Sequence, residues 1–240
     1  MMQLPAENSA SAAHDPTQTL LGVFGGTFDP VHYGHLRLAE EAREALDLRS
    51  VLWIPAGQPP LRQAPAATAA QRLAMLRLAL AGNAAFELDD TEAREPAPSY
   101  SITTLERLRL AQGAEQPLVL LLGVDAFLGL PNWHRWRELL TFAHIAVATR
   151  PGYALDVCNS HQLAEPLASE LHARLRQRTD DLKTAAAGYI VSFEMTPLAI
   201  SATLIRERLS RGASVRYLLP DTVLDYIALN SLYRSAPHGY

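Results

Sequence analysis

The sequence has almost no cysteine, no long apolar run and little excess of charge of either sign. Its single cysteine, Cys158, excludes an intramolecular disulfide and a cysteine-rich metal site, which fits a reducing cytosol. Apolar runs such as residues 118–122 fall far short of the roughly 20 residues that a membrane-spanning helix needs. The first nineteen residues lack the basic and apolar parts of a secretory signal. We therefore expect a cytoplasmic protein with no membrane partner.

The charge balance also limits the kinds of partner. Lysine and arginine number 21 and aspartate and glutamate 25, so the formal net charge of the 240 residues is −4. Such a chain has no bulk electrostatic attraction to nucleic acid, although a local basic pocket can still hold phosphates. We therefore expect small-molecule partners and no nucleic acid, and we leave a homo-oligomer open.

Short apolar runs alternate with longer amphipathic stretches from residue 20 onward. This alternation predicts an α/β fold, a Rossmann-like, doubly wound and mainly parallel sheet with helices on both faces and a short C-terminal helical part. The expected strands are residues 20–24, 51–55, 86–89, 118–123, 145–149 and 189–193. The expected helices are residues 33–46, 69–81, 102–111, 133–140 and 161–176.

The same pattern gives the expected domain organisation. Residues 1–19 are predicted to be a flexible tail, residues 20–234 a single domain with its helical part from about 195, and residues 235–240 a loose tail. Residues 55–68 and 91–99, which are rich in proline, are predicted to be long loops. Each is either a lid or substrate wall, or an ordinary surface linker.

The most specific feature is the run Gly-Gly-Thr-Phe-Asp-Pro-Val-His-Tyr-Gly-His at residues 25–35, directly after the first predicted strand. Ligands of doubly wound sheets bind at the carboxyl ends of the strands. Gly25 and Gly26 lack a Cβ, so the chain can turn sharply and bring N–H groups close to an anion. The N–H groups from Gly26 to Phe28, the Thr27 hydroxyl and the next helix N-terminus predict an anion site.

His32 and His35 are three residues apart in the first turn of a predicted helix, which places both rings on one side. The favoured role for the pair is donation of hydrogen bonds to phosphate oxygens. A structural role and zinc binding are the alternatives. Zinc needs a third ligand, and no Glu or Cys has the spacing of a metalloprotease helix, so we expect no protein-bound metal.

A second segment, Ile-Ser-Ala-Thr-Leu-Ile-Arg at residues 200–206, follows the last predicted strand. Ser201 can cap a helix whose N–H groups face an anion, and Arg206 offers a bidentate fork for phosphate. A plain helix cap and a surface charge are the alternative roles. Two anion sites in one chain indicate a triphosphate ligand.

The two segments resemble the signatures Gly-Gly-x-Phe-x-Pro-x-His-x-Gly-His and Ile-Ser-x-Thr-x-x-Arg of the nucleotidyltransferase superfamily that is related to class I aminoacyl-tRNA synthetases. A resemblance to the bacterial nicotinate-mononucleotide adenylyltransferases covers nearly all of the chain from Leu21 to Tyr233. It is carried by Ile54-Pro55, Pro59-Pro60, Gln71-Arg72-x-x-Met75-Leu76, Ala97-Pro98-Ser99-Tyr100, Gly123-x-Asp125, Trp133 and Arg150-Pro151-Gly152-Tyr153.

The resemblance implies adenylyl transfer from ATP, with Mg²⁺, to nicotinate mononucleotide, which gives nicotinate adenine dinucleotide and pyrophosphate in NAD biosynthesis. The implied catalytic residues are His32, His35 and Arg206. The implied ATP and phosphate ligands are Gly25, Gly26, Thr27, Phe28, Ser201 and Thr203. Two alternatives remain: transfer to nicotinamide mononucleotide or another small phosphate, and a nucleotide-binding sensor without turnover.

The resemblance also implies a substrate side. Trp133 is expected to stack on the pyridine ring, for which its large flat face is suited. Backbone groups near Tyr100 and Ser101 are expected to hold the nicotinate carboxylate, and Asp125 to lie near a ribose or the phosphate-bound metal. A rim aromatic and a helix cap are the alternatives for Trp133 and Asp125.

One stretch departs from the family pattern. Family members commonly continue the Pro-Pro pair with a histidine and a basic residue, whereas Leu61 and Arg62 follow here. Leu61 cannot contact a phosphate. Either Arg62 covers the substrate charge alone, or this loop closes differently.

Overall fold

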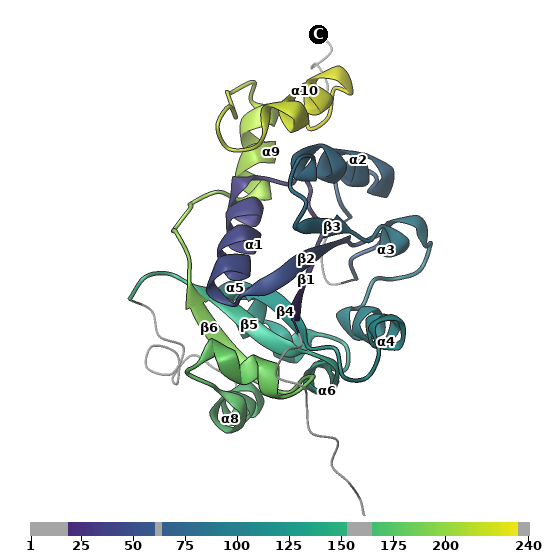
Figure 1. Ribbon diagram of the computed structural model, residues 1–240. Helices are drawn as coiled ribbons and strands as arrows, with labels where there is room; N and C mark the ends of the chain where they lie inside the picture. The colour runs from purple at the N-terminus through teal and green to yellow at the C-terminus, as the bar shows by residue number, and fades with distance from the viewer. Residues whose placement is uncertain (1–18, 61–63, 153–164, 235–240) are drawn as a thin grey trace, which may run out of the picture.

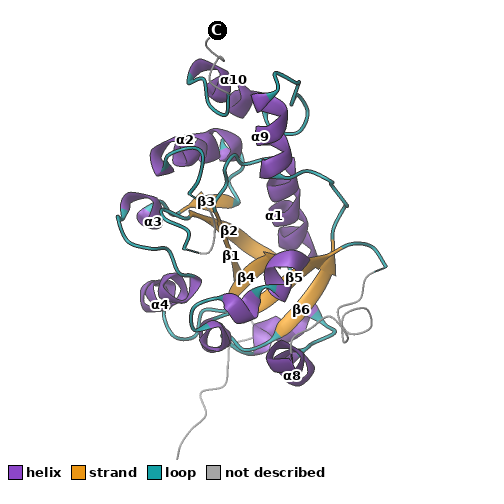
Figure 2. Cartoon of the chain, turned by 180° about the vertical axis from the view of Figure 1, so that it is seen from behind, coloured by secondary structure: helices purple, strands orange, loops and turns teal. Residues whose placement is uncertain are grey.

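Six parallel strands form one sheet in the order β3-β2-β1-β4-β5-β6 (Figures 1 and 2). The structure is a computed structural model, and it describes residues 19–60, 64–152 and 165–234. The expected doubly wound, parallel architecture is confirmed. The strands are β1 (Leu20–Gly26), β2 (Leu48–Pro55), β3 (Phe86–Leu88), β4 (Leu118–Gly123), β5 (His144–Thr149) and β6 (Ile190–Glu194).

Strand order reverses beside β1. From β1 the chain moves outward to β2 and β3, then returns to the other side of β1 and continues to β4, β5 and β6. β1 therefore lies between β2 and β4, with Val23 in register with Leu120. A reversal of this kind opens a crevice at the carboxyl ends of the two strands where ligands bind. Here those ends are Gly26 of β1 and Gly123 of β4.

The helices cover both faces of the sheet (Figure 1). None of the helices within the described ranges is long and apolar enough to cross a bilayer. The α-helices are α1 (Tyr33–Ala45), α2 (Ala69–Leu80), α3 (Thr91–Arg94), α4 (Ser101–Gln112), α5 (Val124–Leu128), α6 (Leu139–Phe142), α8 (Glu165–Arg174), α9 (Ala202–Ser210) and α10 (Asp221–Leu229). Short 3₁₀ turns are η1 (Leu130–Asn132), η2 (Trp136–Glu138) and η3 (Thr179–Thr184).

Alternate residues of β4 enter two different cores. Leu118, Leu120 and Leu122 pack with α4, α5, α6 and α8, whereas Val119 and Leu121 pack with α1, α2, α9 and α10. Side chains of a strand point alternately to opposite faces, and both faces of a parallel sheet are buried. This is why β4 is an unbroken apolar run in the sequence.

Two expected elements differ from the structure. Residues 133–140 do not form one helix, because Trp133, which follows η1, is extended, and Arg135 adopts a positive φ of 51° directly before η2 and α6. The expected loop at residues 91–99 begins with the short helix α3, whose first N–H donates to Asp89 Oδ1 at 3.0 Å. The helix expected at residues 161–176 is α8, and residues 161–164 lie outside the described part.

Candidate active site

A cleft of about 1470 Å³ opens at the carboxyl ends of β1 and β4. It brings together the first motif after β1, the second motif at the start of α9 and the segment that follows β4. Arg62 lies outside the described residues. The other residues predicted from the sequence all line this cleft: Gly25, Gly26, Thr27, Phe28, His32, His35, Tyr100, Ser101, Asp125, Trp133, Ser201, Thr203 and Arg206.

The two histidines form a stacked pair at the start of α1. His32 is the extended residue that precedes the helix, and His35 lies in its first turn. Their ring centroids are 3.7 Å apart, with an angle of 21° between the planes. Gly34 makes room for this pair, since a Cβ there would lie 3.0 Å from His32 Nδ1 and 3.4 Å from the oxygen of Ile200. The predicted placement of both rings on one side is therefore found.

Burial keeps His32 uncharged at neutral pH. His32 is only 5% exposed, and burial lowers its pKa from 6.5 to about 4, so its ring is neutral at pH 7. A neutral imidazole has one N–H donor and one acceptor nitrogen. Nδ1 of His32 is buried and has no hydrogen-bond partner among the described residues. A ligand that pairs with this atom would remove an unfavourable buried polar group.

Gly25 and Gly26 begin the segment at residues 25–32, between β1 and α1, which we call the phosphate loop, and the two glycines have different surroundings. A Cβ at Gly25 would meet no atom within 4 Å, whereas one at Gly26 would lie 2.8 Å from the ring of Phe28. Phe28 has a positive φ of 49°, and its buried ring packs against Phe24 and Trp53 at centroid distances of 5.6 and 5.3 Å. The ring of Phe28 belongs to the core, so this residue can offer a ligand only its main chain.

The second motif lies directly against the first. Ser201 precedes α9, and its hydroxyl accepts a hydrogen bond from the N–H of Leu204 at 3.1 Å, as a helix cap does. Arg206 Nη1 donates to the main-chain oxygen of Asp29 at 2.7 Å, and Nη2 donates to the Thr203 hydroxyl at 3.3 Å. The guanidinium is thus fixed beside the phosphate loop.

The far end of the cleft combines a helix N-terminus with aromatic rings. Tyr100 precedes α4, and no side chain caps that helix. The Tyr100 ring lies 4.7 Å from the ring of His134, whose neighbour in the chain is the half-buried Trp133. Trp133 and the N-terminus of α4 therefore meet at the same end of the cleft. First-turn N–H groups of an uncapped helix give this end a partial positive charge.

Arg72, which the sequence marks only as part of the family-like stretch at residues 71–76, is buried behind the first motif. Its guanidinium donates to the main-chain oxygens of Thr27 at 2.7 Å, Gly57 at 2.9 Å and Ala67 at 3.3 Å. Burial lowers its pKa, and the nearby carboxylate of Asp29 opposes that change. Arginine on an amphipathic helix is normally a surface residue, so the sequence does not predict that this side chain is buried.

Glu92 is a second residue that the sequence does not single out. Its carboxylate accepts a hydrogen bond from the Thr104 hydroxyl, and burial raises the pKa of this carboxyl. Ser99 joins the same cluster to the loop after β2, because it hydrogen-bonds Glu92 and its hydroxyl accepts from the N–H of Gly57 at 2.9 Å. The cluster fixes the segment that leads into Tyr100.

Hydrogen-bond donors gather at both ends of the cleft. A neutral histidine, main-chain N–H groups and a tethered arginine surround the end of β1, while the helix N-terminus of α4 faces the other end. Such a site can bind and align a polyanion and offset charge that develops on it.

Comparison with known proteins agrees with this geometry. Residues 23–208 match the family model described as Cytidylyltransferase-like. The chain is 57% identical to the probable nicotinate-nucleotide adenylyltransferase of Dechloromonas aromatica, over 90% of this chain and 98% of that protein. It is 47% identical to the probable nicotinate-nucleotide adenylyltransferase of Methylococcus capsulatus, over 89% and 99% of the two chains.

A solved structure supports the fold. The nicotinic acid mononucleotide adenylyltransferase of Plasmodium falciparum complexed with NaAD has a TM-score of 0.67, with 90% of this chain and 97% of that chain covered. Its identity of 13% limits this similarity to the fold. From the family match and the two close relatives, the chain belongs to the cytidylyltransferase-like family and, within it, to the nicotinate-nucleotide adenylyltransferases.

Proposed function

We propose that this protein transfers the adenylyl group of ATP to nicotinate mononucleotide and so forms the nicotinate adenine dinucleotide of NAD biosynthesis. An oxygen of the mononucleotide 5′-phosphate attacks the α-phosphorus of ATP, the bond to the bridging oxygen breaks, and pyrophosphate leaves. The observation that carries this proposal is the single cleft, which holds both motifs at one end and Trp133 beside the N-terminus of α4 at the other.

The phosphates would be handled by donors. A phosphate monoester has its second pKa near 6, so the nucleophile is mostly dianionic at pH 7 and needs no base. His32, His35 and the main-chain N–H groups of residues 26–28 would offset charge on the α-phosphate. Arg206 uses Nη1 to hold Asp29, so its other N–H groups would contact the β- and γ-oxygens with Ser201.

Mg²⁺ would accompany ATP. Within the described ranges, no group of three or more His, Cys, Asp or Glu side chains is placed to hold a metal ion. Mg²⁺ commonly keeps several waters and binds substrate phosphates, so it would be held here mainly by triphosphate oxygens and water. When bound, the ion would offset negative charge on the pyrophosphate that leaves. Asp125, in the first turn of α5, would approach a ribose hydroxyl or a metal-bound water.

The pyridine end would favour the acid over the amide. The carboxylate of nicotinate would bind the uncapped N-terminus of α4 beside Tyr100 and Ser101, while Trp133 stacks on the ring. A negative charge at a helix N-terminus gains about 0.3–2 kcal/mol, and a neutral carboxamide gains less of it. The helix terminus thus contributes directly to substrate choice.

A pyrophosphate-release assay tests the proposal. ATP is supplied with nicotinate mononucleotide, with nicotinamide mononucleotide, or alone. We expect turnover with both mononucleotides, none with ATP alone, and a kcat/KM at least about tenfold higher for the acid, which corresponds to about 1.4 kcal/mol. Absence of turnover with the acid would refute adenylyl transfer, and a faster amide would refute only the substrate assignment.

A further inference from the structure

Asp29 lies within the first motif, but the proposed reaction gives it no role. Its side chain is only 5% exposed, yet three donors converge on its carboxylate. Oδ2 accepts from the N–H of Ala66 at 2.7 Å, and Oδ1 accepts from the N–H of Ala67 at 3.1 Å and from the Tyr233 hydroxyl at 2.7 Å. A buried carboxylate is tolerated only where such hydrogen bonds replace water.

These donors come from distant parts of the chain. Ala66 is 37 residues away and lines the cleft, and Tyr233 is 204 residues away and follows α10. Burial and the hydrogen bond to Asp29 raise the pKa of Tyr233, which keeps its hydroxyl protonated as a donor. One side chain of the phosphate loop therefore holds the cleft wall and the C-terminal segment together.

Asp29 also fixes Arg206. The main-chain oxygen of Asp29 accepts from Arg206 Nη1 at 2.7 Å, and its Oδ2 lies 4.0 Å from the same nitrogen. The second contact of the guanidinium, with the Thr203 hydroxyl, lies within α9 itself. Among the contacts described for it, the orientation of Arg206 relative to the phosphate loop therefore depends on where the main-chain oxygen of Asp29 lies, and the hydrogen bonds of the Asp29 carboxylate hold that part of the loop in place.

We propose that Asp29 is a positioning residue: its carboxylate, which accepts from the N–H groups of Ala66 and Ala67, fixes the phosphate loop so that the main-chain oxygen of Asp29 orients Arg206 toward the triphosphate. The proposal rests on the function proposed above, in which Arg206 contacts the β- and γ-oxygens of ATP. Substitution by asparagine would place an amide N–H against a main-chain N–H and remove the charge that attracts the guanidinium.

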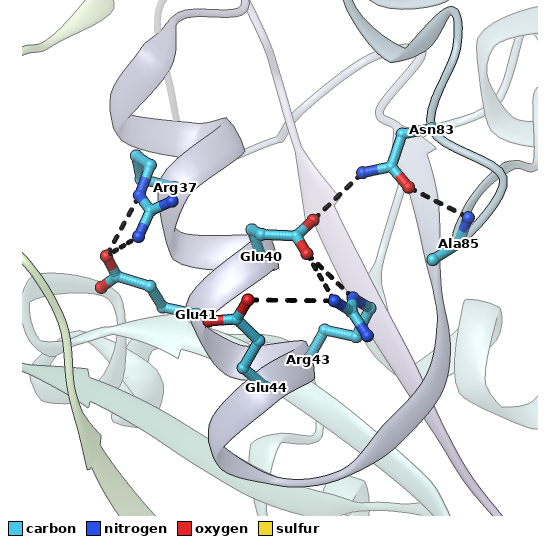
Figure 3. A network of polar contacts seen from close by, with 7 residues as sticks. All are labelled: Arg37, Glu40, Glu41, Arg43, Glu44, Asn83 and Ala85. Carbon is cyan, nitrogen blue, oxygen red and sulfur yellow. Dashed lines mark hydrogen bonds and ion pairs between the residues drawn. The ribbon is translucent and has the colours of Figure 1, made fainter.

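The experiment measures binding of α,β-methylene-ATP by calorimetry, which does not depend on turnover. Asp29→Asn should weaken the Kd about tenfold. Glu40→Gln is the matched control, because it is also an isosteric change of a partly buried carboxylate, on α1 and outside the cleft. Glu40 accepts from Arg43 at 2.6 Å and from Asn83 at 3.0 Å (Figure 3). Its substitution should change the Kd less than twofold.

The same comparison in an Arg206→Lys background separates positioning from general damage. If Asp29 acts through Arg206, Asp29→Asn should change the Kd less than twofold in that background, because coupled residues are not additive. An equal tenfold loss in both backgrounds would overturn the proposal. So would a Kd for Asp29→Asn that equals that of Glu40→Gln.

Tyr233→Phe keeps the proposal testable if Asp29→Asn does not fold. It removes one of the donors to Asp29 and should weaken binding about threefold in the wild-type background and not in the Arg206→Lys background; wild-type affinity would contradict the proposal. Failure of the wild-type protein to bind the analogue would instead contradict the proposed function. The two hypotheses are therefore distinguished by which protein loses binding.

Discussion

Acidification should destabilise the protein through His32. Burial lowers the pKa of this residue to about 4 in the folded protein, whereas the ordinary value of 6.5 applies to the unfolded chain. Between these two values the unfolded chain binds a proton that the folded protein excludes. The free energy of unfolding therefore falls as the pH decreases from about 6.5 to about 4, and His32 has no such effect above that range.

The size of the effect follows from the gap between the two pKa values. That gap corresponds to about 3 kcal/mol once the pH is below both, and to about 2 kcal/mol at pH 5. Domains are typically stable by about 5–15 kcal/mol, so a loss of this size is easily measured. Few other single groups in the described structure should contribute as much at pH 5, because burial lowers the pKa of His32 so far.

The assay is urea unfolding of the wild-type protein and of His32→Gln at pH 7 and pH 5. Carboxylates affect both proteins equally, so their contribution cancels when the two pH differences are compared. We expect the variant to lose about 2 kcal/mol less than the wild type on acidification. Equal losses, or an NMR titration of the His32 ring with its midpoint near 6.5, would refute the reasoning.

His32 should also take up a proton when a nucleotide binds. A phosphate against the ring favours the charged form and raises the pKa of His32. At pH 5, binding of α,β-methylene-ATP should therefore take up protons in the wild-type protein and fewer in His32→Gln. Calorimetry in two buffers of different ionisation enthalpy measures the difference, and equal uptake by both proteins would show that the phosphates do not reach His32.

Three further substitutions probe the cleft. His35→Ala should lower kcat at least about 10²-fold, the loss expected for one transition-state donor, and unchanged turnover in a folded variant would refute its role. Trp133→Ala should raise KM for nicotinate mononucleotide at least about tenfold and leave KM for ATP within about twofold, since we propose that the ring stacks only on the pyridine; equal increases would argue against stacking. Gly34→Ala would place a Cβ 3.0 Å from His32 Nδ1, so kcat and the melting temperature should both fall, and a variant with wild-type values of both would show that the ring can move without cost.

The fold could be predicted because its signals are local and repeated. The apolar run of β4 indicates a strand buried on both faces, and the amphipathic stretch of α1 indicates a helix with one covered face. The exception is residues 133–140, where the apolar spacing of Trp133 and Trp136 resembles that of a helix. Arg135 has a positive φ there, and no glycine or asparagine at that position predicts it.

The sequence predicts which residues line the site, but it does not predict the contacts that these residues make with one another. Both motifs were expected to face one ligand, and they do line one cleft. Their mutual contacts arise from tertiary packing, so they leave no trace in spacing. The hydrogen bond from Arg206 to Asp29 and the burial of Arg72 beneath the phosphate loop both depend on elements that meet only in the folded chain.

The two glycines at the start of the first motif should respond differently to the same change. A Cβ at Gly26 would lie 2.8 Å from the ring of Phe28, which is buried in the core. The main effect of Gly26→Ala should therefore be a lower melting temperature. A Cβ at Gly25 meets no atom within 4 Å, and Gly25 lines the cleft in which we propose that the nucleotide phosphates bind. Gly25→Ala should therefore keep the melting temperature within a few degrees while it weakens binding of α,β-methylene-ATP at least about tenfold. Both quantities can be measured on this matched pair, and equal loss of stability in both variants would mean that the motif acts on the fold alone.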